Sequence, residues 1–195
     1  MPAVREQFVI DIPGLGDDRS RGETLIPRLW KPHGLTVIYH PVGWSGREPF
    51  EPKQERILEV VDRLAKIGDV SLLGSSAGAT AALNTFAQRP DVIKKVVTIA
   101  GAIGDSHPLK SEDYELNPAF QQSRELLPYS LEQLSPDDRY RVLCMHGLWD
   151  GRVNIKDSVL DGAHEQTLPM AGHVTSIAYA LTLGSYSIAR FIKSA

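Results

Sequence analysis

The feature that most constrains this chain is the alternation of short apolar runs with longer segments of helical periodicity. Each clear run is rich in β-branched and aliphatic side chains and ends at Gly or Pro, a pattern that predicts buried strands. These runs are FVIDI (8–12), LTVIYH (35–40), DVSLLG (69–74), VVTIA (96–100) and RVLCMH (141–146). A weaker run, HEQTLP (164–169), is predicted as a sixth strand because the order of elements requires one there.

The segments between these runs predict helices. Residues 52–68 place Ile57, Val61 and Leu64 on one apolar stripe, with a proline near the start and a glycine at the end. Further helices are predicted over 76–90, over 174–193 and somewhere within 20–31. Strands that alternate with helices predict an α/β fold: a three-layer sandwich in which a six-stranded, mostly parallel sheet carries helices on both faces.

Length and composition indicate a single globular domain over residues 1–195. The content of 42% hydrophobic and 23% charged residues is that of an ordinary folded protein. A net charge of -3 without a basic run disfavours nucleic acid as a partner, and no apolar segment is long enough for integral membrane association. The N-terminus lacks the pattern of a signal peptide, so a cytoplasmic location is expected, while the oligomeric state is not indicated. The single Cys144 lies in an apolar run and is predicted to be buried and inert.

The sequence GSSAG (74–78) places a serine between a predicted strand and a predicted helix, in the pattern G-x-S-x-G. This context is typical of a nucleophile held on a sharp turn, where the glycines let neighbouring backbone pass and the helix N-terminus favours negative charge. We therefore predict Ser76 as a nucleophile, although a serine here could also merely cap the helix. Ser45 begins a similar pattern, but Arg47 replaces the second glycine, and Ser45 is interpreted as a loop residue.

A serine nucleophile needs a base and an acid that orients the base. His173 follows the last predicted strand and is the preferred base, with His107 as the reserve. Asp150 follows the fifth strand and is the preferred acid, ahead of Asp157. The carboxyl ends of parallel strands meet at one edge of the sheet, so these side chains are expected to lie near Ser76.

The motifs GSSAG, HGLWDGRV and AGH, in this order, resemble the nucleophile elbow, acid loop and histidine turn of the α/β-hydrolase family. The resemblance implies Ser76, Asp150 and His173 as the catalytic triad. It also implies an oxyanion hole formed by the backbone N–H groups of Ala77 and of Leu15, with Gly16 as the alternative to Leu15. It implies a minimal member of the family, without the two leading strands and with at most a small lid-like insertion over about 101–140.

Two expectations concern access to the site. Prolines at 108, 118, 128 and 136 are expected to limit any helix in the insertion to two or three turns. Trp44 and Trp149 come from loops at the same edge of the sheet as Ser76 and could wall an apolar groove, or could be packing residues.

These residues together predict a serine esterase, similar to lipases, that cleaves small-molecule carboxylic esters with short to medium acyl chains. No metal or organic cofactor is implied. One alternative is a ligand-binding protein or receptor of the hydrolase fold with little turnover. Another is a dinucleotide-binding domain, but Arg19 stands where its third glycine would be, so that pattern fails.

Overall fold

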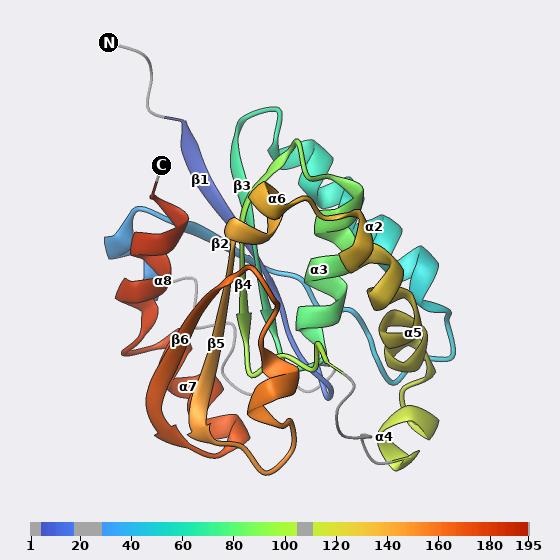
Figure 1. The fold of residues 1–195 in the computed structure, drawn as a ribbon. Coiled ribbons are helices and arrows are strands. Elements are labelled where there is room, and N and C mark those ends of the chain that lie inside the picture. The colour runs from blue at the N-terminus through green and yellow to red at the C-terminus, as the bar shows by residue number, and fades with distance from the viewer. Residues whose placement is uncertain (1–4, 18–28, 105–110, 195) are drawn as a thin grey trace.

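The computed structural model describes residues 5–17, 29–104 and 111–194. Its centre is a six-stranded sheet in the order β2-β1-β3-β4-β5-β6, with every neighbouring pair parallel (Figure 1). The strands are β1 (Glu6–Ile12), β2 (Thr36–Tyr39), β3 (Gly68–Ser75), β4 (Ile93–Ile99), β5 (Val142–Trp149) and β6 (His164–Ala171). All six predicted strands are confirmed, including the weak sixth.

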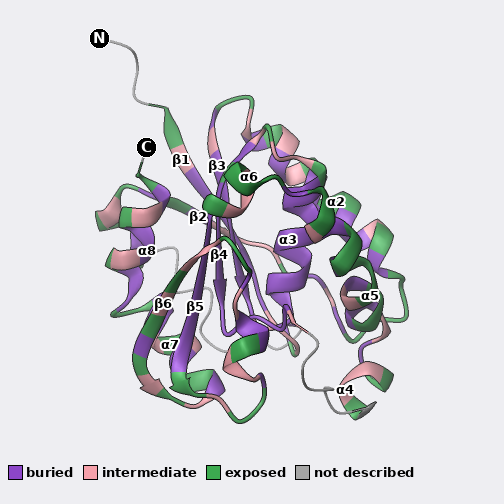
Figure 2. Cartoon of the chain, in the orientation of Figure 1, coloured by how far each residue is buried: buried purple, intermediate pink, exposed green. Residues whose placement is uncertain are grey.

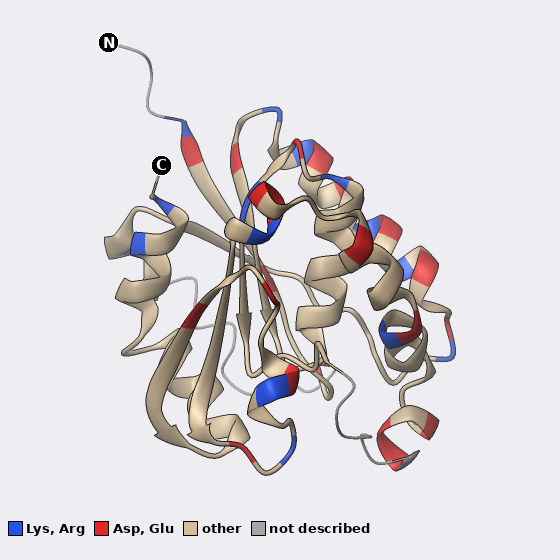
Figure 3. Ribbon diagram, in the orientation of Figure 1, with Lys and Arg blue, Asp and Glu red and all other residues tan. Residues whose placement is uncertain are grey.

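Helices cover both faces of this sheet, as predicted. They are α2 (Phe50–Leu64), α3 (Gly78–Gln88), α4 (Ser111–Glu115), α5 (Pro118–Gln133), α6 (Pro136–Tyr140), α7 (His173–Leu181) and α8 (Ser185–Ile192), with short 3-10 turns η2 (Lys31–His33) and η3 (Ile155–Ser158). Helices α2, α3 and α5 pack on one face of the sheet, and α7 and α8 pack on the other. Figure 2 shows the central strands buried between these layers, and Figure 3 shows the charged residues mainly on the helices and connections.

Successive strand residues point to opposite faces and so build two cores. Ile10 and Leu72 belong to the core beneath α2 and α3, whereas Val9 and Leu73 belong to the core beneath α7 and α8. Cys144 lies in the first core and is fully buried, as predicted, and burial raises the pKa of its thiol. The central strands are buried on both faces, which explains why polar and apolar residues do not alternate along them in the sequence.

One predicted helix differs from the structure, and a second cannot be compared with it. The closing segment 174–193 forms two helices, α7 and α8, because the chain turns at Thr182 and because Gly184 packs tightly on the backbone of Ala180. The helix expected within 20–31 falls largely outside the described residues, which resume at residue 29.

The expected limit on helix length in 101–140 is wrong. Helix α5 has 16 residues and contains Pro128, which is exposed. A proline inside a helix costs about 3 kcal/mol, but the opposite side of α5 buries Phe120 and Leu127. Burial of large apolar side chains stabilises by about 1.5–3 kcal/mol each, which offsets the proline.

Helix α5 is fixed along α3. The Ser123 hydroxyl lies 2.6 Å from the hydroxyl of Thr80, and the Asn84 side-chain amide donates to the Ser123 carbonyl oxygen at 2.9 Å. All three residues are fully buried. The part of the predicted insertion that forms α5 is therefore held against helix α3.

We expect Ser123→Ala to lower the free energy of unfolding by about 1–3 kcal/mol, because it leaves buried polar groups of α3 without their partner. Urea unfolding measures this loss. Ser130→Ala is the matched control: Ser130 is buried on the same helix and makes no side-chain hydrogen bond to a described residue. Equal losses in the two variants would show that the hydrogen bonds do not fix α5.

Candidate active site

Ser76 lies in the turn between β3 and α3 with a φ of 53°. This left-handed conformation is strained for a residue with a Cβ and costs about 1–3 kcal/mol. The turn is held by a hydrogen bond from the Ser76 N–H to the Ile99 carbonyl at the end of β4, at 2.9 Å. The surrounding sheet therefore maintains a serine conformation that the isolated chain would avoid.

The two glycines of the GSSAG motif are required by close backbone contacts. A Cβ at Gly74 would lie 2.6 Å from the Gly78 carbonyl oxygen. A Cβ at Gly78 would overlap the carbonyl oxygen of Ile12 and lie 2.7 Å from that of Pro13. Helix α3 can begin directly against the end of β1 only because these positions carry no side chain.

The Ser76, His173 and Asp150 side chains form one hydrogen-bonded chain. The Ser76 Oγ lies 2.8 Å from His173 Nε2, and His173 Nδ1 lies 2.7 Å from Asp150 Oδ2. Ser76 follows β3, Asp150 follows β5 and His173 follows β6, so three strand ends supply the three residues. The side chains of His173 and Asp150 are 8% and 2% exposed, which shields the hydrogen bond between them from water.

The Asp150 carboxylate is held in its charged form. Burial alone would raise its pKa, but the hydrogen bonds from His173 and from the backbone N–H groups of Arg152 and Val153 outweigh burial, and the pKa is lowered. Asp157, the other candidate acid, lies in η3, where its main-chain oxygen accepts hydrogen bonds from Ile103 and Gly104.

The turn before His173 fixes the imidazole. Gly172 has a φ of 99°, which favours glycine, and its N–H donates to the Trp149 carbonyl at 2.7 Å. The Ser176 hydroxyl donates to the Gly172 carbonyl at 2.7 Å. The histidine turn is thereby tied to the residue that precedes Asp150.

The loop after β1 lies against Ser76. A Cβ at Gly14 would lie 2.9 Å from the Cβ of Ser76. No hydrogen-bond acceptor among the described residues is assigned to the backbone N–H of Leu15 or Ala77. Both donors therefore remain candidates for binding a developing oxyanion next to Ser76.

Of the two interpretations of Trp44, the structure supports the packing residue and contradicts the wall of an open groove. Its side chain is fully buried, stacked on Phe50 at an interplanar angle of 5° and in edge contact with Phe120 at 78°. A side chain inside the core cannot line an open surface. Trp149 is 63% exposed beside Asp150, and its role in a groove stays a prediction.

Ser45 and His146 take no part in this chain of hydrogen bonds. Ser45 is exposed in the loop after β2, and His107 lies outside the described residues. His146 is buried, with its Nε2 2.8 Å from Glu165. Within the described ranges, no three His, Cys, Asp or Glu side chains are grouped so that they could bind a metal, and no helix has the length and apolarity needed to cross a bilayer.

A sheet of this order, with a strained serine between β3 and α3 and a histidine and an aspartate at later strand ends, defines the α/β-hydrolase fold. Solved structures with this fold agree with that assignment. Est1E from Butyrivibrio proteoclasticus has a TM-score of 0.71 at 18% identity, over 96% of this chain and 87% of that protein. The monoacylglycerol lipase of Paleococcus ferrophilus has a TM-score of 0.64 at 15% identity, covering 97% and 95%.

A third similar structure is human thioesterase 2, with a TM-score of 0.60 at 13% identity over 96% of each chain. At the level of sequence, neither a profile of a known family nor a curated protein matches this chain. The similarity thus establishes the α/β-hydrolase fold.

Proposed function

We propose that the protein is a serine hydrolase of small-molecule carboxylic esters that works through an acyl-enzyme. The observation that carries this proposal is the chain of hydrogen bonds from Ser76 through His173 to Asp150, built on a serine with a φ of 53°. A serine in a strained backbone conformation, hydrogen-bonded to a histidine that is held by a charged carboxylate, is suited to nucleophilic catalysis. Packing alone does not require this arrangement.

In the proposed reaction, Ser76 Oγ attacks the ester carbonyl carbon while His173 Nε2 takes the serine proton. Asp150 stabilises the resulting imidazolium, and the N–H groups of Leu15 and Ala77 bind the oxyanion. The carbon–oxygen bond to the alcohol then breaks, and the alcohol leaves with the proton from His173. Water, deprotonated by His173, attacks the acyl-enzyme and releases the acid and free Ser76.

The proposed preference for short to medium acyl chains rests on three exposed apolar residues. Leu148, Trp149 and Val174 are 63%, 63% and 71% exposed and flank Asp150 and His173 in the sequence. If these side chains contact the acyl group, they would bury its first carbons and leave the far end of a long chain in water. Each buried methylene contributes about 0.8 kcal/mol.

We therefore expect kcat/KM to rise over the first few acyl carbons and then to level off. Kinetics on soluble esters of graded acyl length, with a thioester of matched length for comparison, measure this profile. A continued rise into long chains, or a jump above the solubility limit of the substrate, would contradict the open site and would indicate a lid.

Labelling with a fluorophosphonate tests the nucleophile separately from turnover. An activated Ser76 forms a covalent adduct, which mass spectrometry assigns to the peptide that contains it. Labelling with no ester turnover across the panel would favour a ligand-binding protein with the hydrolase fold, and absence of labelling would reject the proposal.

A further inference from the structure

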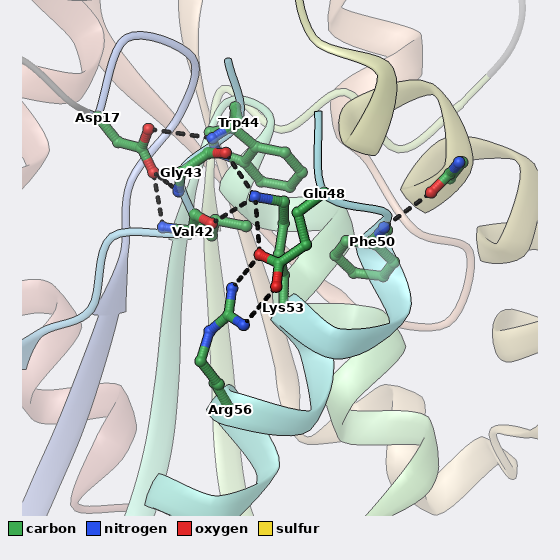
Figure 4. A network of polar contacts seen from close by, with 9 residues as sticks. Asp17, Val42, Gly43, Trp44, Glu48, Phe50, Lys53 and Arg56 are labelled. Atoms are coloured by element: carbon green, nitrogen blue, oxygen red, sulfur yellow. Dashed lines mark hydrogen bonds and ion pairs between the residues drawn. The ribbon is translucent and has the colours of Figure 1, made fainter. Parts of the chain in front are cut away.

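Asp17 is a buried carboxylate that connects two loops at the candidate site. It is 6% exposed, and its Oδ2 accepts hydrogen bonds from the backbone N–H groups of Val42 at 2.6 Å and Gly43 at 2.7 Å (Figure 4). Its Oδ1 accepts from the Trp44 N–H at 3.3 Å. The loop after β1 is thereby bonded to the loop after β2.

Lys53 of α2 binds the same backbone from the opposite side. Its side-chain Nζ donates to the Gly43 carbonyl at 2.7 Å and to the Val42 carbonyl at 3.4 Å, and the residue is 3% exposed. The peptide units 42–43 and 43–44 therefore each direct the N–H toward Asp17 and the C=O toward Lys53 (Figure 4). Their dipoles are aligned between two opposite charges, which stabilises both buried ions.

The start of the loop after β1 is fixed by a further contact with the loop after β2. The indole N–H of Trp44 donates to the Pro13 carbonyl at 3.0 Å, and Trp44 itself is fully buried. The loop after β1 is thus held at Pro13 and at Asp17. The three residues between these points, 14–16, include the glycine that lies against Ser76 and the Leu15 N–H.

We propose that Asp17 is a positioning residue for the hydrolysis proposed above: it holds the Leu15 N–H at the place where the oxyanion forms. This inference rests on the proposed function. A donor that binds the oxyanion acts in the transition state and contributes little to binding of the ground-state ester. Displacement of the loop should therefore lower kcat and leave KM nearly unchanged.

The test compares three variants with the wild-type protein in steady-state kinetics. Asp17→Asn keeps the size of the side chain but turns one acceptor into an amide donor, and we expect kcat to fall roughly 10–100-fold. Asp17→Ala removes all three hydrogen bonds, and we expect the loss typical of an oxyanion donor, on the order of 100–1000-fold. KM should stay within about twofold in both.

Glu48→Gln is the matched control. Glu48 belongs to the same network, where hydrogen bonds from Arg56 lower its pKa to about 2, but it contacts Lys53 and Arg56 and not the loop 13–17. Its kcat should remain within about twofold of the wild type. Thermal unfolding checks that each protein is folded at the assay temperature. If Asp17→Ala does not fold, the kinetics of Asp17→Asn alone decide the test.

A second measurement distinguishes a displaced Leu15 N–H from general damage to the active site. An alkyl boronic acid forms a tetrahedral adduct with a serine nucleophile and places an oxygen where the oxyanion would lie. Its affinity should weaken in the Asp17 variants by about the same factor as kcat, while the inhibition constant of a carboxylic acid product should not change.

Three results would overturn the inference. Folded Asp17 variants with wild-type kcat would reject it, and so would a rise in KM at unchanged kcat, because that result assigns the loop to substrate binding. A wild-type protein with neither turnover nor fluorophosphonate labelling would reject the proposed function and this inference together. When the wild type is active, either of the first two results would reject the inference alone.

Discussion

Ser76→Ala is expected to lower kcat for ester hydrolysis on the order of a million-fold, the loss seen when the nucleophile of a serine triad is removed. The variant has no hydroxyl to attack the carbonyl, whereas His173 and Asp150 keep their mutual hydrogen bond. Alanine meets the same strain as serine at a φ of 53°, so the free energy of unfolding should change by less than about 1 kcal/mol. Ester kinetics and urea unfolding on the same preparation measure both quantities.

Two neighbouring serines serve as controls for this variant. Ser75 is buried at the end of β3 with a hydroxyl that has no hydrogen-bond partner among the described residues, and Ser45 is exposed in the loop after β2. Ser75→Ala and Ser45→Ala should retain most activity. If Ser45→Ala lost as much activity as Ser76→Ala, the nucleophile would have been assigned to the wrong loop.

Gly78→Ala is expected to damage both stability and catalysis. The new methyl group would overlap the Ile12 carbonyl at the end of β1 and lie 2.7 Å from that of Pro13. Backbone must shift to relieve the overlap, which costs about 1–3 kcal/mol or more. Because Pro13 begins the loop that carries Leu15, we also expect kcat to fall by at least tenfold at a temperature where the variant is folded.

Gly162→Ala is the control for this substitution. Gly162 has a φ of 83° and lies between β5 and β6, where an added Cβ would meet only Arg139 side-chain atoms at 3.5 Å. This variant should lose about 1–2 kcal/mol from backbone strain and keep its kcat. A Gly78→Ala protein as stable and active as the wild type would show that β1 and α3 can separate without disturbing the site.

The sheet could be predicted because its strands are buried on both faces. Val70, Leu72 and Leu73 are fully buried although they point to different cores, so the sequence shows an unbroken apolar run. The hydrogen-bonded chain from Ser76 to Asp150 could be predicted for a related reason. In a parallel sheet the residue after each strand lies at one edge, and polar residues after apolar runs are easy to recognise.

The surroundings of the site could not be predicted in the same way. Trp44 is buried because Phe50 at the start of α2 and Phe120 of α5, which is distant in the sequence, pack against its indole. Pro128 is tolerated because the other side of α5 packs on α3. Asp17 stands in GLGDDR as one of two adjacent aspartates, and nothing in that sequence distinguishes a buried carboxylate from a turn residue. Each of these depends on tertiary contacts that no local pattern encodes.

Strand β6, which precedes His173, is less firmly held in the sheet than the strands that precede Ser76 and Asp150. It lies at one edge of the sheet, hydrogen-bonded to β5 alone among the described strands, and only Leu168 along it is buried. An edge strand with so little apolar contact can detach at a lower free energy than the whole domain unfolds. Detachment would carry away His173 and leave Ser76 and Asp150 on the intact part of the sheet. We therefore expect the hydrogen-bonded chain from Ser76 to Asp150 to be lost when β6 opens, before the sheet core unfolds.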